Sequence, residues 1–399
     1  MFCLSPSIWI WVSSGMETPL IVLLQVAIWA NVEAFAAGES RRSLVFVCLA
    51  QGLLVLARAD GFVTGAIVTA YFVVTRRPAA ARSVFATTVG VFLAMVSLRY
   101  LYYGAIWPLT YYAKVTTTLP KRVLAALSQF GGVASRHGVL PYEVALLFAS
   151  LAWLRNLRVN GALELRTVPF GVFFSVAWMS YWFYIGGDNF EDRFLLPLIP
   201  ITVTLIFQLL GAEGRVAWPM FVTLALALQL SPVVRDERFG KQLRRKYDYR
   251  VELGKYIGAH WPGKVLATPA AGKIPFYSRL KTIDMLGLTD AHIAHVQPAT
   301  FIPGHSKEDS EYVLGRKPDL IAGLLWGDEL GIGVGLDEAQ YEPAGYRVRL
   351  LVNSTAVSRG PEDILDVSAR SHDELLLLAH RGWRGVLLER YAPTTERPN

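Results

Sequence analysis

The sequence has few cysteines, few charged residues in its first part, and none of the compact motifs of soluble nucleotide- or metal-dependent enzymes. Its two cysteines are Cys3 and Cys48, and no disulfide framework can be read from them. It has no glycine-rich phosphate loop, no zinc-type Cys/His spacing and no nucleophile elbow. His292 and His295 lie three residues apart but are more typical of a helix surface than of a metal site. The sequence therefore gives no support to those enzyme classes.

Charge is distributed unevenly along the 399 residues. Residues 1–234 carry 26 charged side chains and residues 235–399 carry 45, which is about 11% and about 27% of each part. The net charge of +7 belongs almost entirely to the first part. Basic and acidic residues nearly balance in the second part, so no nucleic-acid partner is expected. The shift predicts a membrane portion followed by a water-soluble one.

Apolar runs predict a polytopic α-helical membrane bundle of about eight spans in residues 1–234. Several runs are shorter than the ~20 residues that a perpendicular helix needs, but flanking aromatic residues can supply the missing length. The runs are 19–37, 43–57, 61–75, 83–98, 140–155, 167–185, 194–210 and 216–233.

The pattern after Val234 predicts a small soluble α/β domain over residues 235–393, with a disordered polar tail over 394–399. Short apolar runs predict strands, and helical spacing predicts a helix at 372–380. The predicted strands are 264–268, 281–285, 319–322, 346–352 and 384–389.

Four loops that hold nine arginines indicate how the predicted bundle is oriented. By the positive-inside rule these loops face the cytoplasm, so the remaining loops and everything after residue 234 lie outside. The loop at 99–139 carries five basic residues, but it is the longest loop and its charge density is lower. The arginine-bearing loops are 39–42, 76–82, 155–166 and 213–215.

A cluster of charged residues between two predicted spans is the strongest candidate site. Asp188, Glu191 and Asp192 could coordinate a divalent cation or hold a sugar hydroxyl, and Arg193 is suited to a phosphate. The alternative is a solvated loop that caps the next helix, because acidic residues favour a helix N-terminus.

Other candidates lie on the same predicted side. Arg58 and Asp60 occupy a turn between two apolar runs, where a salt bridge that holds a helical hairpin is the alternative to a functional role. Glu17 could bind substrate or could be a helix-start carboxylate. Lys114 follows a tyrosine-rich stretch and could contact phosphate or anchor the chain at an interface. From that stretch we add Tyr103 and Tyr112 as candidate substrate contacts.

At these residues the chain resembles a known family of membrane enzymes. The motifs are Ser-Gly-Met-Glu-Thr-Pro-Leu (14–20), Ala-Arg-Ala-Asp-Gly (57–61), Arg-Tyr-Leu-Tyr-Tyr-Gly (99–104), Pro-Leu-Thr-Tyr-Tyr-Ala-Lys (108–114), Gly-Gly-Asp-Asn-Phe-Glu-Asp-Arg-Phe-Leu-Leu-Pro (186–197), Ala-Gly-Lys-Ile-Pro-Phe-Tyr-Ser (271–278) and Ile-Asp-Met-Leu-Gly-Leu-Thr-Asp (283–290). In this order they resemble the GT-C superfamily of polytopic glycosyltransferases, and within it the branch of AftB-like terminal arabinofuranosyltransferases.

The resemblance implies transfer of a sugar, with arabinofuranose the first candidate, from a polyprenyl-phosphate donor to a cell-envelope glycan. It implies a bacterial inner-membrane protein whose C-terminal domain lies in the periplasm. A general base would activate the acceptor hydroxyl, and cationic groups would stabilise the departing phosphate. It suggests Asp188 and Asp60 as catalytic residues. The substrate-binding residues it suggests are Glu17, Arg58, Lys114 and Arg193.

One departure from the family pattern concerns the start of the chain. The resemblance places the family's catalytic aspartate in a loop upstream of Ser14, after a first membrane helix, whereas only thirteen residues precede Ser14 here. We therefore expect either a fragment with a misplaced start or a shortened paralogue, and whether the chain is active alone stays open. Two alternatives remain open: a carrier or flippase for a lipid-linked sugar, and an inactive partner subunit of a glycosyltransferase.

Overall fold

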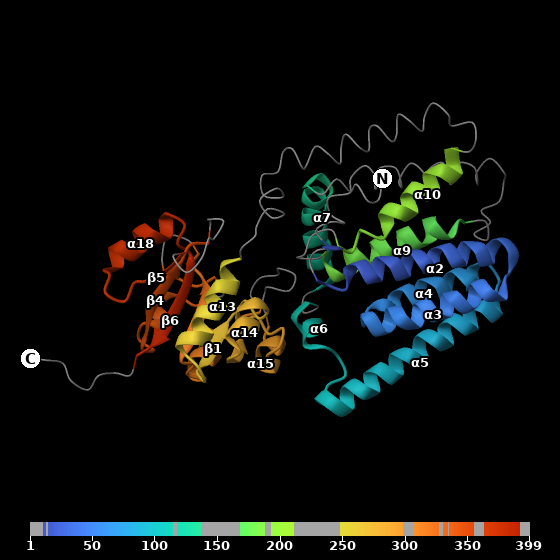
Figure 1. The fold of residues 1–399 in the computed structure, drawn as a ribbon. Coiled ribbons are helices and arrows are strands. Elements are labelled where there is room, and N and C mark those ends of the chain that lie inside the picture. Colours follow the sequence, from blue (N-terminus) through green and yellow to red (C-terminus); the bar gives the residue numbers. More distant parts are fainter. Residues whose placement is uncertain are drawn as a thin grey trace, which may run out of the picture. The chain divides into compact units, whose positions relative to one another are not determined.

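The chain folds into two compact units in the computed structural model, shown in Figure 1. The first, called the helical unit, comprises Met1–Trp107 and Thr118–Leu243; the second, called the sheet unit, comprises Pro108–Thr117 and Arg244–Asn399. The residues that the structure describes are 11–12, 15–114, 118–136, 168–187, 193–210, 248–297, 307–326, 330–333, 335–354 and 363–391. The predicted boundary between residues 234 and 235 and the predicted tail at 394–399 lie outside them.

Apolar helices form the helical unit. Pro19 and Pro78 lie in the first turns of two of these helices. N–H groups in a first turn make no hydrogen bond within the helix, so proline, which has no N–H, is tolerated there. Gly104 caps the C-terminal end of the helix that begins at Pro78, and Gly186 caps that of another helix, both in the left-handed conformation that glycine adopts readily. The described helices are α2 (Thr18–Gly38), α3 (Arg41–Ala57), α4 (Gly61–Val74), α5 (Pro78–Tyr103), α7 (Leu119–Arg136), α9 (Phe170–Ile185) and α10 (Leu198–Leu210).

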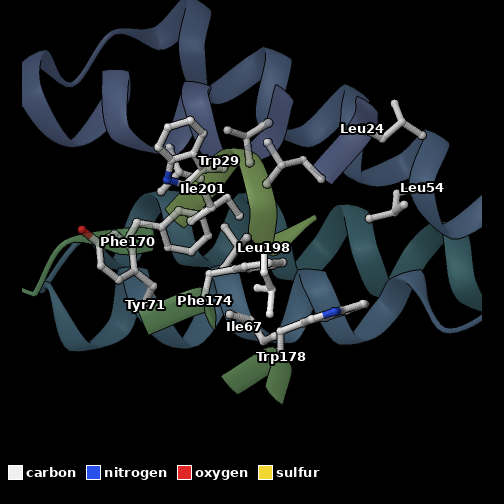
Figure 2. Close-up of a cluster of buried hydrophobic side chains, with 14 of the residues drawn as sticks. Leu24, Trp29, Leu54, Ile67, Tyr71, Phe170, Phe174, Trp178, Leu198 and Ile201 are labelled. Carbon is white, nitrogen blue, oxygen red and sulfur yellow. The ribbon is translucent and has the colours of Figure 1, made fainter. Parts of the chain in front are cut away.

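The core of the helical unit joins helices that are far apart in the sequence. Trp29 of α2, Tyr71 of α4, Phe170 and Phe174 of α9 and Ile201 of α10 converge in it (Figure 2). The Tyr71 and Phe170 rings lie 4.9 Å apart, and the Tyr71 hydroxyl donates a hydrogen bond to the Val168 carbonyl at 3.3 Å. Burial of these aromatic side chains holds α9 and α10 against the N-terminal helices.

The prediction of an eight-span membrane bundle is wrong. Among the residues that the structure describes, two helices are long and apolar enough to cross a membrane, α2 and α5. The apolar helices α4 and α9 have 14 and 16 residues. At 1.5 Å per residue, a helix of the length of α4 reaches about 21 Å, well short of a hydrocarbon layer of about 30 Å. The predicted spans at 140–155 and 216–233 lie outside the described residues.

The sheet unit contains a mixed six-stranded sheet in the order β2-β1-β3-β6-β4-β5. The first three strands of this order run parallel, and β6, β4 and β5 pair antiparallel. The strands are β1 (Val265–Thr268), β2 (Lys281–Asp284), β3 (Leu320–Leu324), β4 (Tyr346–Val352), β5 (Ile364–Asp366) and β6 (Gly385–Arg390). The five strands predicted from the sequence are present, while β5 was not predicted.

Helices cover both faces of this sheet. On one face α13 (Tyr249–His260) and α14 (Lys273–Ser278) pack against Leu350 and Leu387. The other face carries α15 (Ala291–His295), α16 (Ser310–Gly315), α17 (Glu338–Tyr341) and α18 (His372–His380), the last at the predicted residues. The short helix α6 (Leu109–Lys114) also belongs to this unit, where the Tyr112 ring lies 4.3 Å from the His295 ring.

Asp319 ties the ends of three neighbouring strands together. Its carboxylate accepts a hydrogen bond from the Val265 amide at 2.9 Å and lies 3.4 Å from Lys264 Nζ and 3.6 Å from Arg390 Nη2. The Val265 hydrogen bond first, and the two cations second, hold the pKa of this carboxyl below its usual 3.8. Because the folded pKa is the lower one, this stabilisation is present above the unfolded pKa and is lost as pH falls through the folded value.

We predict that Asp319→Asn speeds amide hydrogen exchange in β1 and β3 about fivefold at pH 7, corresponding to a loss of about 1 kcal/mol for a partly exposed charged hydrogen bond. Below pH 3 the difference from the wild type should shrink. Asp373→Asn, at an exposed position in α18, is the control and should leave β1 and β3 unchanged. Hydrogen exchange is followed in the intact chain by mass spectrometry. Equal exchange rates of the β1 and β3 amides in the two variants would contradict this interpretation.

A close contact between α3 and the backbone of α4 at Gly61 constrains the helical unit. A Cβ added at Gly61 would lie 2.6 Å from the Leu54 carbonyl oxygen, a backbone atom that cannot move alone. We therefore predict that Gly61→Ala destabilises the chain by about 1–3 kcal/mol. Gly90→Ala in α5, where the added atom meets open space, should be neutral or slightly stabilising. Equal midpoints of thermal unfolding for the two variants would show that the contact is not constraining.

Candidate functional site

The turn between α3 and α4 holds a guanidinium and a carboxylate at one end of the helical unit. Arg58 ends α3 in an extended conformation, and its carbonyl accepts a hydrogen bond from the Gly61 amide at 2.9 Å. Asp60 directly precedes the first residue of α4. Gln51 Nε2 donates to the Gly61 carbonyl at 3.0 Å, which anchors the turn to the buried side of α3. The turn is short because Gly61 lets the two helices meet.

The charged side chains of this turn are in contact with a third group from the start of α2. Arg58 Nε lies 2.9 Å from Asp60 Oδ1, and Arg58 Nη1 lies 3.7 Å from Glu17 Oε1. The Arg58 and Asp60 side chains are 20% and 22% exposed, so the shorter pair is mostly shielded from water. Partial shielding strengthens the pair relative to an exposed surface ion pair.

Aromatic side chains form a wall beside these charges. The Tyr181 hydroxyl donates to Asp60 Oδ2 at 3.5 Å, and the Arg58 guanidinium lies 4.3 Å from the centre of the Phe194 ring. Trp178 Nε1 donates to the Phe194 carbonyl at 2.6 Å, and the Trp178 ring stacks on Phe194 at 6.3 Å. Cation–π contact and the indole hydrogen bond fix the position of Phe194.

Arg193 brings a second guanidinium to the same ring. It lies in the turn that leads into α10, is 6% exposed, and its Cζ lies 5.4 Å from the Phe194 ring centre. Phe194 therefore lies against two arginines from segments far apart in the chain. We call this assembly the Arg58 cluster; its members are Glu17, Arg58, Asp60, Trp178, Tyr181, Arg193 and Phe194.

The cluster joins several residues that the sequence singled out. Glu17, Arg58 and Asp60 are in contact, and Arg193 meets Arg58 through Phe194. The salt bridge proposed for a helical hairpin is present, and it is part of a larger assembly. The contacts of Tyr181 and Phe194 were not predicted. The crowded aromatic residues at 178–184 were the signal in the sequence, and they are typical of an interfacial belt or of a wall against which a lipid or sugar packs.

The other predicted site residues are elsewhere or are not described. Tyr103 is exposed at the end of α5, where the Arg99 guanidinium lies 5.2 Å from its ring, and no described contact joins it to the Arg58 cluster. Tyr112 and Lys114 belong to α6 in the sheet unit. Asp188 lies outside the described residues, as do Glu191 and Asp192. Within the described part of the chain there is no group of three or more metal-ligating side chains.

Arg122 was not predicted as a site residue, and its environment is unusual. It is 8% exposed in α7, and its guanidinium lies 4.6 Å from the centre of the Tyr184 ring. In the part of the chain that the structure describes, its Nε and Nη1 atoms are buried without a hydrogen-bond partner, as are Gln129 Oε1 and Trp182 Nε1. Buried polar atoms without partners are destabilising, so they mark places where water or a ligand group is expected.

Comparisons with known proteins bear on the sheet unit. A family model described as "Domain of unknown function (DUF8728)" matches residues 240–367. No curated protein and no solved structure matches the chain. The family match covers about a third of the chain and includes no member of the Arg58 cluster.

Proposed function

We propose that this chain is a membrane glycosyltransferase that moves a sugar from a polyprenyl-phosphate donor to a cell-envelope glycan, with arabinofuranose as the first sugar to test. The observation that carries the proposal is the Arg58 cluster. It gathers carboxylates, guanidiniums and aromatic faces from four separate segments of the helical unit. A sugar phosphate needs these three kinds of group.

Each kind of group has a role in the proposed reaction. The Asp60 carboxylate takes the proton of the acceptor hydroxyl as its oxygen bonds to the anomeric carbon of the sugar. The bond between that carbon and the phosphate oxygen breaks, and the polyprenyl phosphate leaves with the bonding electrons. Arg58 and Arg193 offset the charge that develops on the leaving phosphate. Asp188 remains the second candidate for the base.

Arg58 couples donor binding to the state of Asp60 in this scheme. In the structure its Nε is 2.9 Å from Asp60 Oδ1, so the carboxylate is engaged with a cation. A donor phosphate competes for the same guanidinium, because guanidinium binds carboxylate and phosphate oxygens with similar geometry. When Arg58 turns to the phosphate, Asp60 is released to accept the proton of the acceptor.

The distribution of charges along α2 supports action at one face of a membrane. The Arg58 cluster lies at the N-terminal end of α2, and arginines gather at its C-terminal end. There Arg77 Nη2 donates to the Ala36 carbonyl at 2.8 Å, and Arg77 Nε lies 3.4 Å from Glu39 Oε1. By the positive-inside rule the arginine end faces the cytoplasm. We propose an inner-membrane location with the cluster on the periplasmic side.

We predict that Asp60→Asn lowers the rate of sugar transfer at least tenfold, the scale of losing one acid–base group. The assay is transfer of labelled arabinofuranose from a synthetic polyprenyl phosphate to an arabinan acceptor by the purified chain in detergent. Glu39→Gln removes a comparable carboxylate from the Arg77 pair at the other end of α2 and should leave the rate unchanged. Donor binding without transfer by the wild-type chain would instead indicate an inactive partner subunit.

We predict that Arg193→Ala lowers kcat for the same transfer roughly tenfold or more, because a buried cation is lost beside the developing phosphate charge. Arg193→Lys should recover part of this loss, since it restores the charge but not the planar geometry. A rise in KM with kcat unchanged would place Arg193 in donor binding alone. Unaltered kinetics in both variants would remove it from the mechanism.

A further inference from the structure

The sheet unit contains a cavity of about 490 Å³ that is separate from the Arg58 cluster. It lies where the C-terminal end of α13 meets strands β6, β4 and β5, on the sheet face that α13 and α14 cover. Its volume falls within the range of small-molecule sites. Its lining combines the aromatic side chains Tyr256, Trp261 and Tyr391 with the charged side chains Arg349, Asp366 and Glu389.

A β-bulge in β4 directs Arg349 to this face. Val348 pairs with Leu388 of β6, but the next pair along β4 is Leu350 with Leu387, so Arg349 is an extra residue. Val348 lies in the core on the α18 side, whereas Leu350 and Leu387 lie in the core under α13. Regular alternation would put residues 348 and 350 on one face. The bulge therefore places Arg349 and Leu350 together on the face that bears the cavity.

The polar groups of the cavity form a connected set of donors and acceptors. Arg349 Nη2 lies 2.8 Å from Asp366 Oδ2, and Arg349 Nε lies 3.6 Å from Glu389 Oε2. Trp261 Nε1 donates to Glu389 Oε1 at 2.9 Å. The Arg349, Asp366 and Glu389 side chains are 32%, 46% and 27% exposed, so a ligand in the cavity can reach them. The set offers both donors and acceptors within a small area.

Aromatic rings beside the charged groups complete the lining of the cavity. The Tyr256 and His260 rings stack 3.9 Å apart at the end of α13, and Trp261 follows directly as the helix cap. His260 Nδ1 is held at 2.8 Å from the Tyr256 carbonyl, which fixes the imidazole ring. Tyr391 is 39% exposed at the end of β6. Ring faces carry partial negative charge and attract polarised C–H groups.

The charges in the cavity discriminate between ligand classes. Arg349 and Arg390 are balanced by Asp366 and Glu389, so the cavity has no excess positive charge for a phosphate or another anion. An apolar ligand would leave these charged groups buried without water, which is unfavourable. A neutral ligand with many hydroxyls fits: each hydroxyl both donates and accepts, and the C–H face of a sugar ring stacks on an aromatic ring.

We propose that this cavity binds a neutral glycan segment, with Trp261 as the stacking platform and the Arg349–Asp366–Glu389 set as the hydroxyl-binding groups. The site does not depend on the proposed transfer reaction, because it shares no residue with the Arg58 cluster. Binding of a glycan here would hold a polysaccharide chain against the sheet unit whatever chemistry the helical unit performs.

The test is binding of the intact 399-residue chain, in detergent, to arrays of neutral oligosaccharides alongside phosphorylated and sulfated ones. We expect retention of neutral glycans, with at least a tenfold loss of affinity in Trp261→Ala. Asp366→Asn, a milder change on the edge strand, should lower affinity severalfold without altering the unfolding midpoint. Trp326→Ala is the matched control, because Trp326 is a 66% exposed tryptophan of the same unit outside the cavity lining. The glycan affinity of this variant should equal that of the wild type.

Three outcomes would overturn the proposal: absence of any neutral glycan ligand for the wild type, wild-type affinity in both Trp261→Ala and Asp366→Asn, or preference for the anionic glycans. Sugar transfer by the same preparations is measured separately. Lost transfer with intact glycan binding would count against the proposed function alone, and intact transfer with no glycan binding would count against this site alone.

Discussion

The close approach of α3 and α4 at Gly61 is the constraint on which the candidate site depends. Any side chain at position 61 would collide with the Leu54 carbonyl. Glycine avoids this collision, and the two helices can therefore meet through a turn of only Arg58, Ala59 and Asp60. Gln51 of α3 reinforces the contact by donating to the Gly61 carbonyl, and Gln25 of α2 ties that helix to α4 by donating to Thr64 at 3.0 Å. In an apolar helical unit such hydrogen bonds are sparse and directional, so they define one register between the helices where apolar packing alone would allow several. The ion pair of the turn follows from that register.

Both candidate sites lie where regular secondary structure is interrupted. In the helical unit the interruption is the turn before α4, and in the sheet unit it is the bulge at Arg349, which moves Leu350 to the opposite face of the sheet from the one that alternation predicts. In each case an arginine at the interruption contacts two carboxylates: Glu17 and Asp60 for Arg58, Asp366 and Glu389 for Arg349. An arginine held between two carboxylates is oriented before any ligand arrives, so less side-chain entropy is lost on binding. The ligands that we propose for the two arginines differ because their surroundings differ: buried Arg193 lies beside the first, and open aromatic rings lie beside the second.

The sequence predicted the helices and strands better than it predicted what surrounds each of them in the fold. Strands such as Leu320–Leu324 were recognisable because a fully buried strand is a short apolar run bounded by polar residues. β5 was missed because three residues give no period, and the bulge was missed because it depends on pairing with β6.

The helices over 61–74 and 170–185 were found but interpreted as membrane spans, since hydrophobicity alone does not distinguish a lipid-facing helix from one buried in protein. Glu17, Arg58 and Asp60 were identified as charges in apolar surroundings. Burial of Arg122 was not predictable, because the apolar residues Leu124 and Leu127 of α7 are exposed while Arg122 lies against Tyr184 of α9.

The exposed surface of α5 connects the fold to the proposed lipid-linked donor. This helix packs against α3 and α4, yet only 11% of its apolar window is buried inside the unit, and Phe85, Leu93, Leu98 and Leu101 are all more than half exposed. An apolar surface of this size is unfavourable in water and marks a place for lipid or for a partner. Lipid on this surface would place the helical unit in contact with the acyl chains of a bilayer. The polyprenyl chain of the donor would then reach the protein by lateral diffusion within that bilayer. The prenyl part of the donor then needs no binding pocket, because the bilayer solvates it. The protein would have to recognise only the phosphate and the sugar, and those are the groups for which the guanidiniums, carboxylates and aromatic rings of the Arg58 cluster are suited.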